Sequence, residues 1–354
     1  MEKKWLIYGA YGYTGELIAR EAKERGMRPV LAGRNPDKLK PLCDELQLEA
    51  RVFPVDANAA ENLSDIALVL HCAGPFKKTS APMIEACLEA GAHYLDITGE
   101  ISVFEHSFSQ DAAAKKAGIT LCSGAGFDVI PTDCTALRLK ELLPDAVSLS
   151  LGFDSDSGIS PGTFKTMIEG MGSGSAERRT GKIVPVPLGS QRRMIDFGRG
   201  KRSSIGIPWG DVSTAFYTTN IPNISTWIPM NKSRILGARL FSRAGSLLAL
   251  PAIQKALKNW VERRVSGPDE ALRAGAPAYI WGEARNAGGI VKTVRIQTAN
   301  VYDVTVYGAL EAVSRLLDGD FPSGSQTPAA LFGSDLIEGL PGSGKFEEET
   351  IYPA

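Results

Sequence analysis

Short apolar runs alternate with longer helix-compatible stretches over the first third of the chain. The apolar runs cover residues 5–8, 29–32, 51–54, 68–72, 93–97 and 119–123. Six buried strands separated by helices are the pattern of a parallel, doubly wound α/β sheet. Helix signals agree, because Pro36 stands in the first turn of a helical run at 38–48 and Gly91 ends another at 83–90.

Beyond Pro131 the pattern changes. One helical run at 132–143 precedes stretches rich in Gly, Ser and Thr, with strands expected near 147–153, 182–187, 278–283 and 293–299. A helical pattern returns at 302–317 and leads into a tail rich in Ser, Pro and Gly. We therefore expect a first domain over 1–131, a second α+β domain for substrate binding and dimerisation over 132–302, and a returning helix with a tail over 303–354 that packs against the first domain.

Composition narrows the class of protein. A chain of 354 residues with 44% hydrophobic residues, 22% charged residues and a net charge of -1 is typical of a globular protein of about two domains, and it gives no support to nucleic-acid binding. The N-terminus lacks the apolar stretch of a signal peptide, so a cytoplasmic protein is expected. The five cysteines are scattered, which predicts reduced thiols in the core and no disulfide framework. The three histidines are too few and too separated to predict a metal site.

A glycine-dense turn follows the first predicted strand. It reads Gly9-Ala10-Tyr11-Gly12-Tyr13-Thr14-Gly15 and leads directly into a helical run. Small residues at 9 and 10 permit a tight turn, Gly12 lets backbone amides approach a pyrophosphate, and Gly15 lets the helix pack on the strand. Although Ala10 departs from the commonest fingerprint, the place of the loop predicts a dinucleotide site in a Rossmann domain. A glycine turn without a ligand is the alternative.

The end of the second strand selects the dinucleotide. An NAD enzyme usually has Asp or Glu there for the ribose 2′-hydroxyl, whereas this chain has Gly33-Arg34-Asn35. Arg34 can hold a 2′-phosphate with its guanidinium fork, Asn35 can donate a further hydrogen bond, and Lys38 adds charge one turn later. NADP(H) is therefore the expected cofactor, and the alternative leaves Arg34 as an ordinary surface residue.

Further candidates follow the later strands. Asp56 is placed either to accept from the adenine amino group or to cap the following helix. The small residues Ala73, Gly74 and Pro75 leave the fourth strand at the carboxyl edge of the sheet, where ligands of open α/β folds bind. We expect these three to border the pyrophosphate or the nicotinamide ribose.

Carboxylates at the ends of the fifth and sixth strands are candidates for proton transfer. They are Asp96, Glu100 and Asp128, with Thr98 beside them. We expect Asp128 and Glu100 to lie near the reacting centre. The alternative for Asp96 and Asp128 is that they cap helices or tie loops together by accepting from backbone amides.

Three segments resemble the saccharopine dehydrogenase-like oxidoreductases. They are the loop at 9–15, MIEACLEAGAHYLD at 83–96 and GAGFDVIPTD at 124–133, while SGPDE at 266–270 and SQTPAALFG at 325–333 are similar to short bacterial members and to the trans-acting enoyl reductase branch. The resemblance covers mainly residues 4–135. It implies a Rossmann domain, a second domain built on a mixed sheet, and NADP(H)-dependent hydride transfer to or from a C=N or C=C bond of a small or acyl substrate. A non-catalytic NADP(H)-binding redox sensor or scaffold is the alternative.

Three features stand outside this interpretation. Eight basic residues between 178 and 202 form either an anionic-substrate wall or, as we favour, solvated strand edges; they are Arg178, Arg179, Lys182, Arg192, Arg193, Arg199, Lys201 and Arg202. The segment 224–260 is interpreted as a subunit interface, which predicts a homodimer, with peripheral membrane contact as the alternative. GLPGSGKF at 339–346 copies the spacing of a triphosphate-binding loop, but Phe346 replaces the magnesium-binding Ser or Thr.

Overall fold

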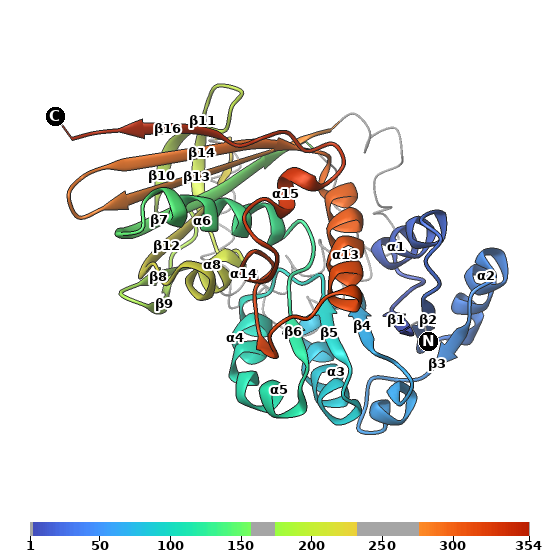
Figure 1. Cartoon of the computed structure of the whole chain (residues 1–354). Coiled ribbons are helices and arrows are strands. Elements are labelled where there is room, and N and C mark those ends of the chain that lie inside the picture. Colours follow the sequence, from blue (N-terminus) through green and yellow to red (C-terminus); the bar gives the residue numbers. More distant parts are fainter. Residues whose placement is uncertain (1–2, 157–173, 232–275, 354) are drawn as a thin grey trace. The chain divides into compact units, whose positions relative to one another are not determined.

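The computed structural model describes residues 3–156, 174–231 and 276–353. These residues form two compact units, which are described separately. The first takes the described residues up to Ile130 together with Tyr302–Phe332, and the second takes those from Pro131 to Val301 and from Gly333 onward. Figure 1 shows that each unit has its own sheet.

The first unit is built on a parallel sheet, as predicted. Its described strands lie in the order β15-β6-β5-β4-β1-β2-β3, and all neighbours pair in parallel. The strands are β1 (Trp5–Tyr8), β2 (Val30–Gly33), β3 (Ala50–Val52), β4 (Leu68–His71), β5 (His93–Asp96), β6 (Thr120–Cys122) and β15 (Gly324–Ser325). All residues of β1, β2 and β4 are buried, which explains their continuous apolar runs. The short strand β15 was not predicted.

Helices connect these strands. They are α1 (Tyr13–Glu24), α2 (Pro36–Leu46), the 3₁₀ helix η1 (Ala59–Leu63), α3 (Phe76–Ala90), α4 (Ile101–Ser109), α5 (Asp111–Ala117), α13 (Val301–Asp318) and α14 (Pro328–Phe332). On one face of the sheet, Met83 and Cys87 of α3 pack against Leu6, Val30 and Val69 of the strands. This layer fixes the strand ends that carry the candidate residues.

The second unit is α+β and contains a mixed sheet. Its main path runs β10-β11-β12-β7-β13-β14-β16, with β8 and β9 attached through β12, and the β7–β12 pair is parallel among antiparallel neighbours. The strands are β7 (Ala146–Ser155), β8 (Ser175–Arg179), β9 (Lys182–Val186), β10 (Arg192–Asp196), β11 (Lys201–Ile207), β12 (Asn223–Pro229), β13 (Ala278–Asn286), β14 (Val291–Thr298) and β16 (Glu347–Ile351). Leu139 of α6 (Ile130–Leu142) and Ala215 of α8 (Asp211–Thr219) pack on one sheet face against Leu149 and Ile224.

The tail corrects one expectation. Residues 303–354 were expected to pack against the first domain, but from Gly333 onward they belong to the second unit. The reason is a strand pairing, because β16 adds to β14 in antiparallel register after the short helix α15 (Leu336–Gly339). The segment 339–346 therefore leads into a strand, whereas a triphosphate-binding loop leads into a helix.

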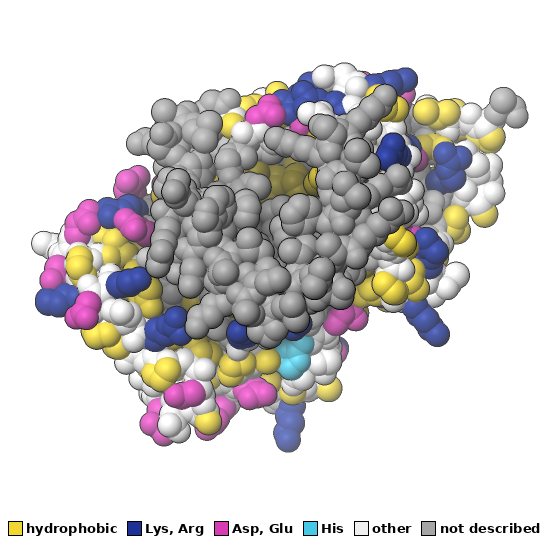
Figure 2. Space-filling view, turned by 180° about the vertical axis from the view of Figure 1, so that it is seen from behind, with side chains coloured by type: hydrophobic (Ala, Val, Ile, Leu, Met, Phe, Trp, Pro, Cys, Tyr) yellow, Lys and Arg dark blue, Asp and Glu magenta, His cyan; other side chains and the backbone are white. Residues whose placement is uncertain are grey.

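Several predictions fall on residues outside the described part of the chain. These are the segment 266–270 and most of 224–260, so the homodimer and the membrane contact stay predictions. Among the described residues, no helix is long and apolar enough to span a membrane. In the space-filling view of Figure 2, basic and acidic side chains are interspersed over the described part of that face, in keeping with a net charge near zero.

Candidate functional site

The glycine loop crosses the carboxyl end of β1 and opens α1. Gly9 adopts a left-handed conformation (φ +85°), and its N–H donates to the Ala32 carbonyl at 2.8 Å. Gly12 is the N-cap residue of α1 and supplies no side-chain cap, while its own N–H donates to the Gly9 carbonyl at 2.9 Å. A helix start that carries no side-chain cap is suited to an anion such as a pyrophosphate.

The loop is packed too closely for side chains at its first and last glycines. A Cβ atom on Gly15 would lie 2.3 Å from the Gly9 carbonyl oxygen, and one on Gly9 would lie 2.9 Å from the Cβ of Ala73. The loop and the exit of β4 therefore touch. This geometry places Ala73 against the loop, while the expectation that Ala73, Gly74 and Pro75 border the pyrophosphate or the nicotinamide ribose stays a prediction. The cradle of bare backbone fits a dinucleotide diphosphate.

The end of β2 forms the adenosine corner of this candidate site. Arg34 is exposed and makes no hydrogen bond or ion pair with another described residue. Asn35 caps α2, because its Oδ1 accepts from the Lys38 N–H at 3.1 Å, so its amide NH₂ is the group left for a ligand. The Lys38 side chain is exposed. Asp56 Oδ1 accepts from the Asn58 N–H at 2.9 Å in the turn ahead of η1, whose N-cap residue is Asn58. The contact of Asp56 with adenine stays a prediction.

Glu100 lies at the carboxyl edge but is engaged by backbone. Its Oε1 accepts from the Phe76 N–H and its Oε2 from the Lys77 N–H, both at 3.1 Å. The carboxylate thus caps the start of α3 from a distant loop, where the helix dipole favours negative charge. A catalytic role for Glu100 stays a prediction, and the contact that the structure shows is one that positions α3.

Asp128 occupies a different environment. A Cβ on Gly99 would lie 2.6 Å from its Oδ2, so the carboxyl group packs against the loop that follows β5. Next to it, the Phe127 N–H donates to Thr305 Oγ1 of α13 at 3.0 Å. Burial raises the pKa of Asp128 to about 7. A carboxyl group that titrates near neutral pH is matched to proton transfer.

Asp96 ties the two loops together. Its Oδ1 accepts from the N–H groups of Thr98 at 3.0 Å and Gly124 at 2.9 Å, and its Oδ2 accepts from the Tyr94 hydroxyl at 2.8 Å. The side chain is fully buried, and burial raises its pKa. The loop-tying alternative is therefore confirmed for Asp96, which holds the segments that carry Glu100 and Asp128.

The histidines predicted as core residues in β4 and β5 both have hydrogen-bonding partners. His71 Nε2 lies 2.9 Å from Thr79 Oγ1, and burial lowers the pKa of His71 to about 3. His93 Nδ1 accepts from the Thr120 N–H at 3.0 Å. The described residues contain no group of three or more side chains arranged to hold a metal ion.

We expect the raised pKa of Asp128 to appear as a pH dependence of stability. The folded pKa, about 7, lies above the unfolded value of 3.8, so between these pH values the unfolded chain loses a proton that the folded chain keeps. Stability therefore falls as pH rises through this window and levels off above about 7. The melting temperature of Asp128→Asn minus that of wild type should grow from pH 4 to 7 and then stay constant. A difference that is independent of pH would contradict the buried carboxyl.

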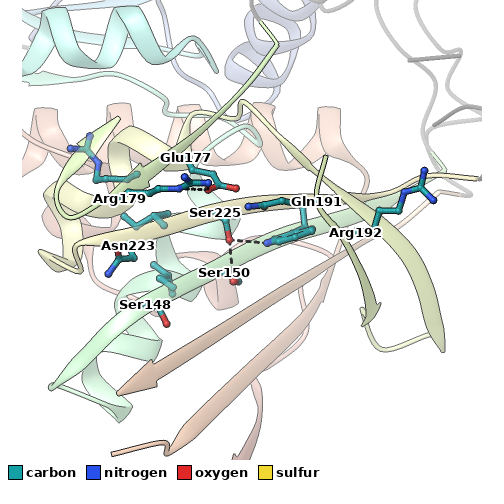
Figure 3. A pocket seen from close by; sticks show the side chains of 12 residues that line it. Ser148, Ser150, Glu177, Arg179, Gln191, Arg192, Asn223 and Ser225 are labelled. Carbon is teal, nitrogen blue, oxygen red and sulfur yellow. Dashed lines mark hydrogen bonds and ion pairs between the residues drawn. The ribbon is translucent and has the colours of Figure 1, made fainter. Parts of the chain in front are cut away.

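The second unit contains a pocket of about 590 Å³ (Figure 3). Its floor is made by neighbouring strands, with Ser150 of β7 in register with Ser225 of β12. Ser225 Oγ accepts from the Trp227 indole N–H at 2.9 Å and lies 3.1 Å from Ser150 Oγ. Oε2 of the buried Glu177 accepts a hydrogen bond from the Arg179 Nε–H, while its Oε1 has no hydrogen-bonding partner among the described residues. Arg178, Arg179 and Arg192, which belong to the basic cluster noted in the sequence, line this pocket. The small polar residues of its floor come from separate strands, so their meeting could not be predicted.

Carboxylates pair with many of the basic residues between 178 and 202. Arg193 pairs with Glu283, and Arg199 and Arg202 both pair with buried Asp154. Lys182, Arg192 and Lys201 are exposed. Such pairs on strands agree better with the strand-edge interpretation than with a wall of free positive charge.

Comparison with known proteins agrees with the first unit. Residues 5–122 match the family model of the saccharopine dehydrogenase NADP binding domain. Over about half of its length the chain is similar to the saccharopine dehydrogenase-like oxidoreductases. Residues 5–122 are accordingly an NADP(H)-binding domain, which confirms the cofactor expected from the loop and the β2 end.

Relatives of this saccharopine dehydrogenase-like chain include a human saccharopine dehydrogenase-like oxidoreductase, 27% identical over 52% of this chain and 50% of the relative. A trans-acting enoyl reductase of Mycobacterium ulcerans is 29% identical over 51% of this chain and 48% of that protein. The chain spans about half the length of the curated relatives it matches. Among solved structures, apo saccharopine dehydrogenase (L-Glu forming) from Saccharomyces cerevisiae has a TM-score of 0.68 over 99% of this chain and 100% of that one, at 12% identity, which shows a shared fold.

Proposed function

We propose that this protein is an NADP(H)-dependent oxidoreductase that transfers hydride to or from a C=N or C=C bond of a small or acyl substrate. One observation carries the proposal. A single sheet edge in the first unit holds both a dinucleotide cradle and Asp128, a carboxyl group with a pKa of about 7. A nucleotide-binding module alone has no need for such a group at this edge. The name of the mycobacterial relative supports the reductive direction.

In the proposed reaction, different residues of this chain bind the cofactor and transfer the proton. The glycine loop and the start of α1 bind the diphosphate, and Arg34 binds the 2′-phosphate. The bound cofactor supplies or accepts the hydride. Reduction of a C=N or C=C bond also consumes one proton, and Asp128 donates it from its protonated carboxyl; in the oxidative direction the carboxylate accepts it. Asp96 positions the loop of Asp128 by binding Gly124.

Nucleotide titration tests the first half of this proposal. We expect purified protein to bind NADPH more tightly than NADH, and Arg34→Ala to weaken NADPH binding about ten- to hundredfold while leaving NADH nearly unchanged. Nucleotide fluorescence provides the dissociation constants. Arg28→Ala removes an exposed arginine just before β2 and serves as the matched control. Equal binding of both nucleotides, before and after the Arg34 substitution, would remove the 2′-phosphate assignment.

Turnover tests the second half. NADPH consumption is followed with panels of imine and enoyl substrates. Oxidation of NADPH that depends on one of these compounds supports the oxidoreductase. Tight NADPH binding without turnover on either panel would instead support a non-catalytic redox sensor.

A further inference from the structure

Tyr11 of the glycine loop reaches across to the end of β2. A Cβ atom on Gly33, the last residue of that strand, would lie 2.4 Å from Tyr11 Cε1, 3.2 Å from Cδ1 and 3.3 Å from Cζ. The backbone of Gly33 is not in the left-handed region, so its conformation does not call for glycine. The ring of Tyr11 does, because it fills the space that a side chain at position 33 would occupy.

Several polar side chains meet at this corner beside the end of β2. The pKa of Tyr8 is raised to about 12, mainly by burial, with smaller contributions from Tyr11 and Asp56 that raise it and one from Arg34 that lowers it. The Tyr11 ring packs on Gly33 and Arg34 is the next residue of the chain, so both lie at the carboxyl end of β2. The Tyr8 hydroxyl itself donates to the Phe53 carbonyl at 2.8 Å and is thereby occupied. The phenol of Tyr11 and the guanidinium of Arg34 are then two donors at this corner, beside the Asn35 amide NH₂ and the exposed Lys38.

The position of the ring gives it a role in specificity. In dinucleotide-binding sheets, the side chain at the end of the second strand meets the ribose, and an acidic residue there selects NAD. Here the Tyr11 ring keeps any side chain off position 33. It puts a phenol, which donates one hydrogen bond, in the region where NAD enzymes place a carboxylate.

We infer that Tyr11 is a specificity-determining residue that donates a hydrogen bond from its hydroxyl to the 2′-phosphate of NADP(H) beside Arg34. This inference rests on the proposed function and adds to it a residue that glycine-loop patterns do not assign. The ring, packed on Gly33, holds the hydroxyl in place. Two donors from different segments, the β1–α1 loop and the β2 end, then recognise one phosphate.

Removal of a single oxygen atom tests this role. We expect Tyr11→Phe to weaken NADPH binding about tenfold or more, the factor of a hydrogen bond to a charged group, with NADH binding unchanged. Dissociation constants come from fluorescence titration of the full chain. Tyr307→Phe makes the same chemical change on α13, where the ring lies under Arg25 at 5.2 Å, and should leave both constants unchanged.

A second pair of variants tests the packing on Gly33. Gly33→Ala should displace the Tyr11 ring, lower the melting temperature and weaken NADPH binding, because the added methyl group overlaps the ring. In the double variant Tyr11→Ala/Gly33→Ala, the methyl group has room. Its melting temperature should therefore be no lower than that of Tyr11→Ala alone.

The outcomes separate the inference from the proposed function. If wild type prefers NADPH and Tyr11→Phe loses affinity for NADPH alone, both stand. If wild type prefers NADPH but Tyr11→Phe binds both nucleotides as wild type does, or loses affinity for both equally, the inference is wrong and the proposed function stands. If wild type binds neither nucleotide, both are wrong.

Discussion

Asp128→Asn is expected to lower the rate of NADPH oxidation by about 10²- to 10⁴-fold, the usual contribution of a positioned general acid. Asparagine keeps the shape of the side chain but has no acidic proton. Because asparagine occupies the same space and the phosphate-binding groups of the glycine loop and the β2 end are unchanged, the dissociation constant of NADPH should stay near the wild-type value. Steady-state rates and nucleotide titration of the same preparation measure the two effects separately.

The role of Asp128 also predicts the direction in which the reaction rate changes with pH. In the reductive direction the protonated carboxyl is active, so the wild-type rate should fall as pH rises through about 7, the pKa that burial gives Asp128. In the oxidative direction the rate should rise over the same range. Asp128→Asn should lose this titration. Asp44→Asn, an exposed carboxylate paired with Lys40 on α2, is the matched control and should keep both the rate and the profile. A full rate for Asp128→Asn would exclude Asp128 as the proton donor.

The first unit could be predicted from local sequence because its strands are buried on both faces. A run such as 68–70 is continuously apolar, which is the pattern of a buried parallel strand, and the loop at 9–15 lies between a strand of this kind and a helix start. The preference for NADP(H) over NAD could also be predicted, because it depends on the residues at one strand end, where the sequence has Arg34 and no Asp or Glu. These inferences need no knowledge of which strands pair.

Contacts between distant residues could not be predicted in this way. Glu100 was singled out for its place after β5, but the amides that it binds belong to the start of α3, 24 residues earlier. Pro75 supplies no cap there, and this absence is the signal that could have pointed to a distant carboxylate. Thr305 reaches Phe127 from 178 residues away, and nothing in either local pattern indicates it.

The second unit shows the same limit in its strands. Glu347–Ile351 begins with three glutamates, a composition that does not favour strands. It pairs with β14, where Arg295 donates to Glu349 at 3.2 Å and Lys292 to the Thr350 hydroxyl at 2.7 Å. The strand therefore depends on its partner, and the expectation that the tail packs on the first domain was wrong for that reason.

Gly15→Ala is expected to abolish NADPH binding and to lower the melting temperature, whereas Gly12→Ala should fold with less loss. The added Cβ at position 15 would lie 2.3 Å from the Gly9 carbonyl oxygen, 3.0 Å from its carbon and 3.1 Å from Ala10 Cα. All three are backbone atoms, which cannot swing aside as a side chain can, so α1 must move away from β1. At position 12 the nearest atom is the same oxygen at 3.2 Å, a contact that a small shift relieves. Gly339→Ala, where a Cβ would meet nothing within 4 Å, controls for the substitution itself. Thermal unfolding and NADPH titration of the three variants measure the order of effects, and wild-type affinity in Gly15→Ala would show that the close approach of α1 to the loop is not needed for the cofactor.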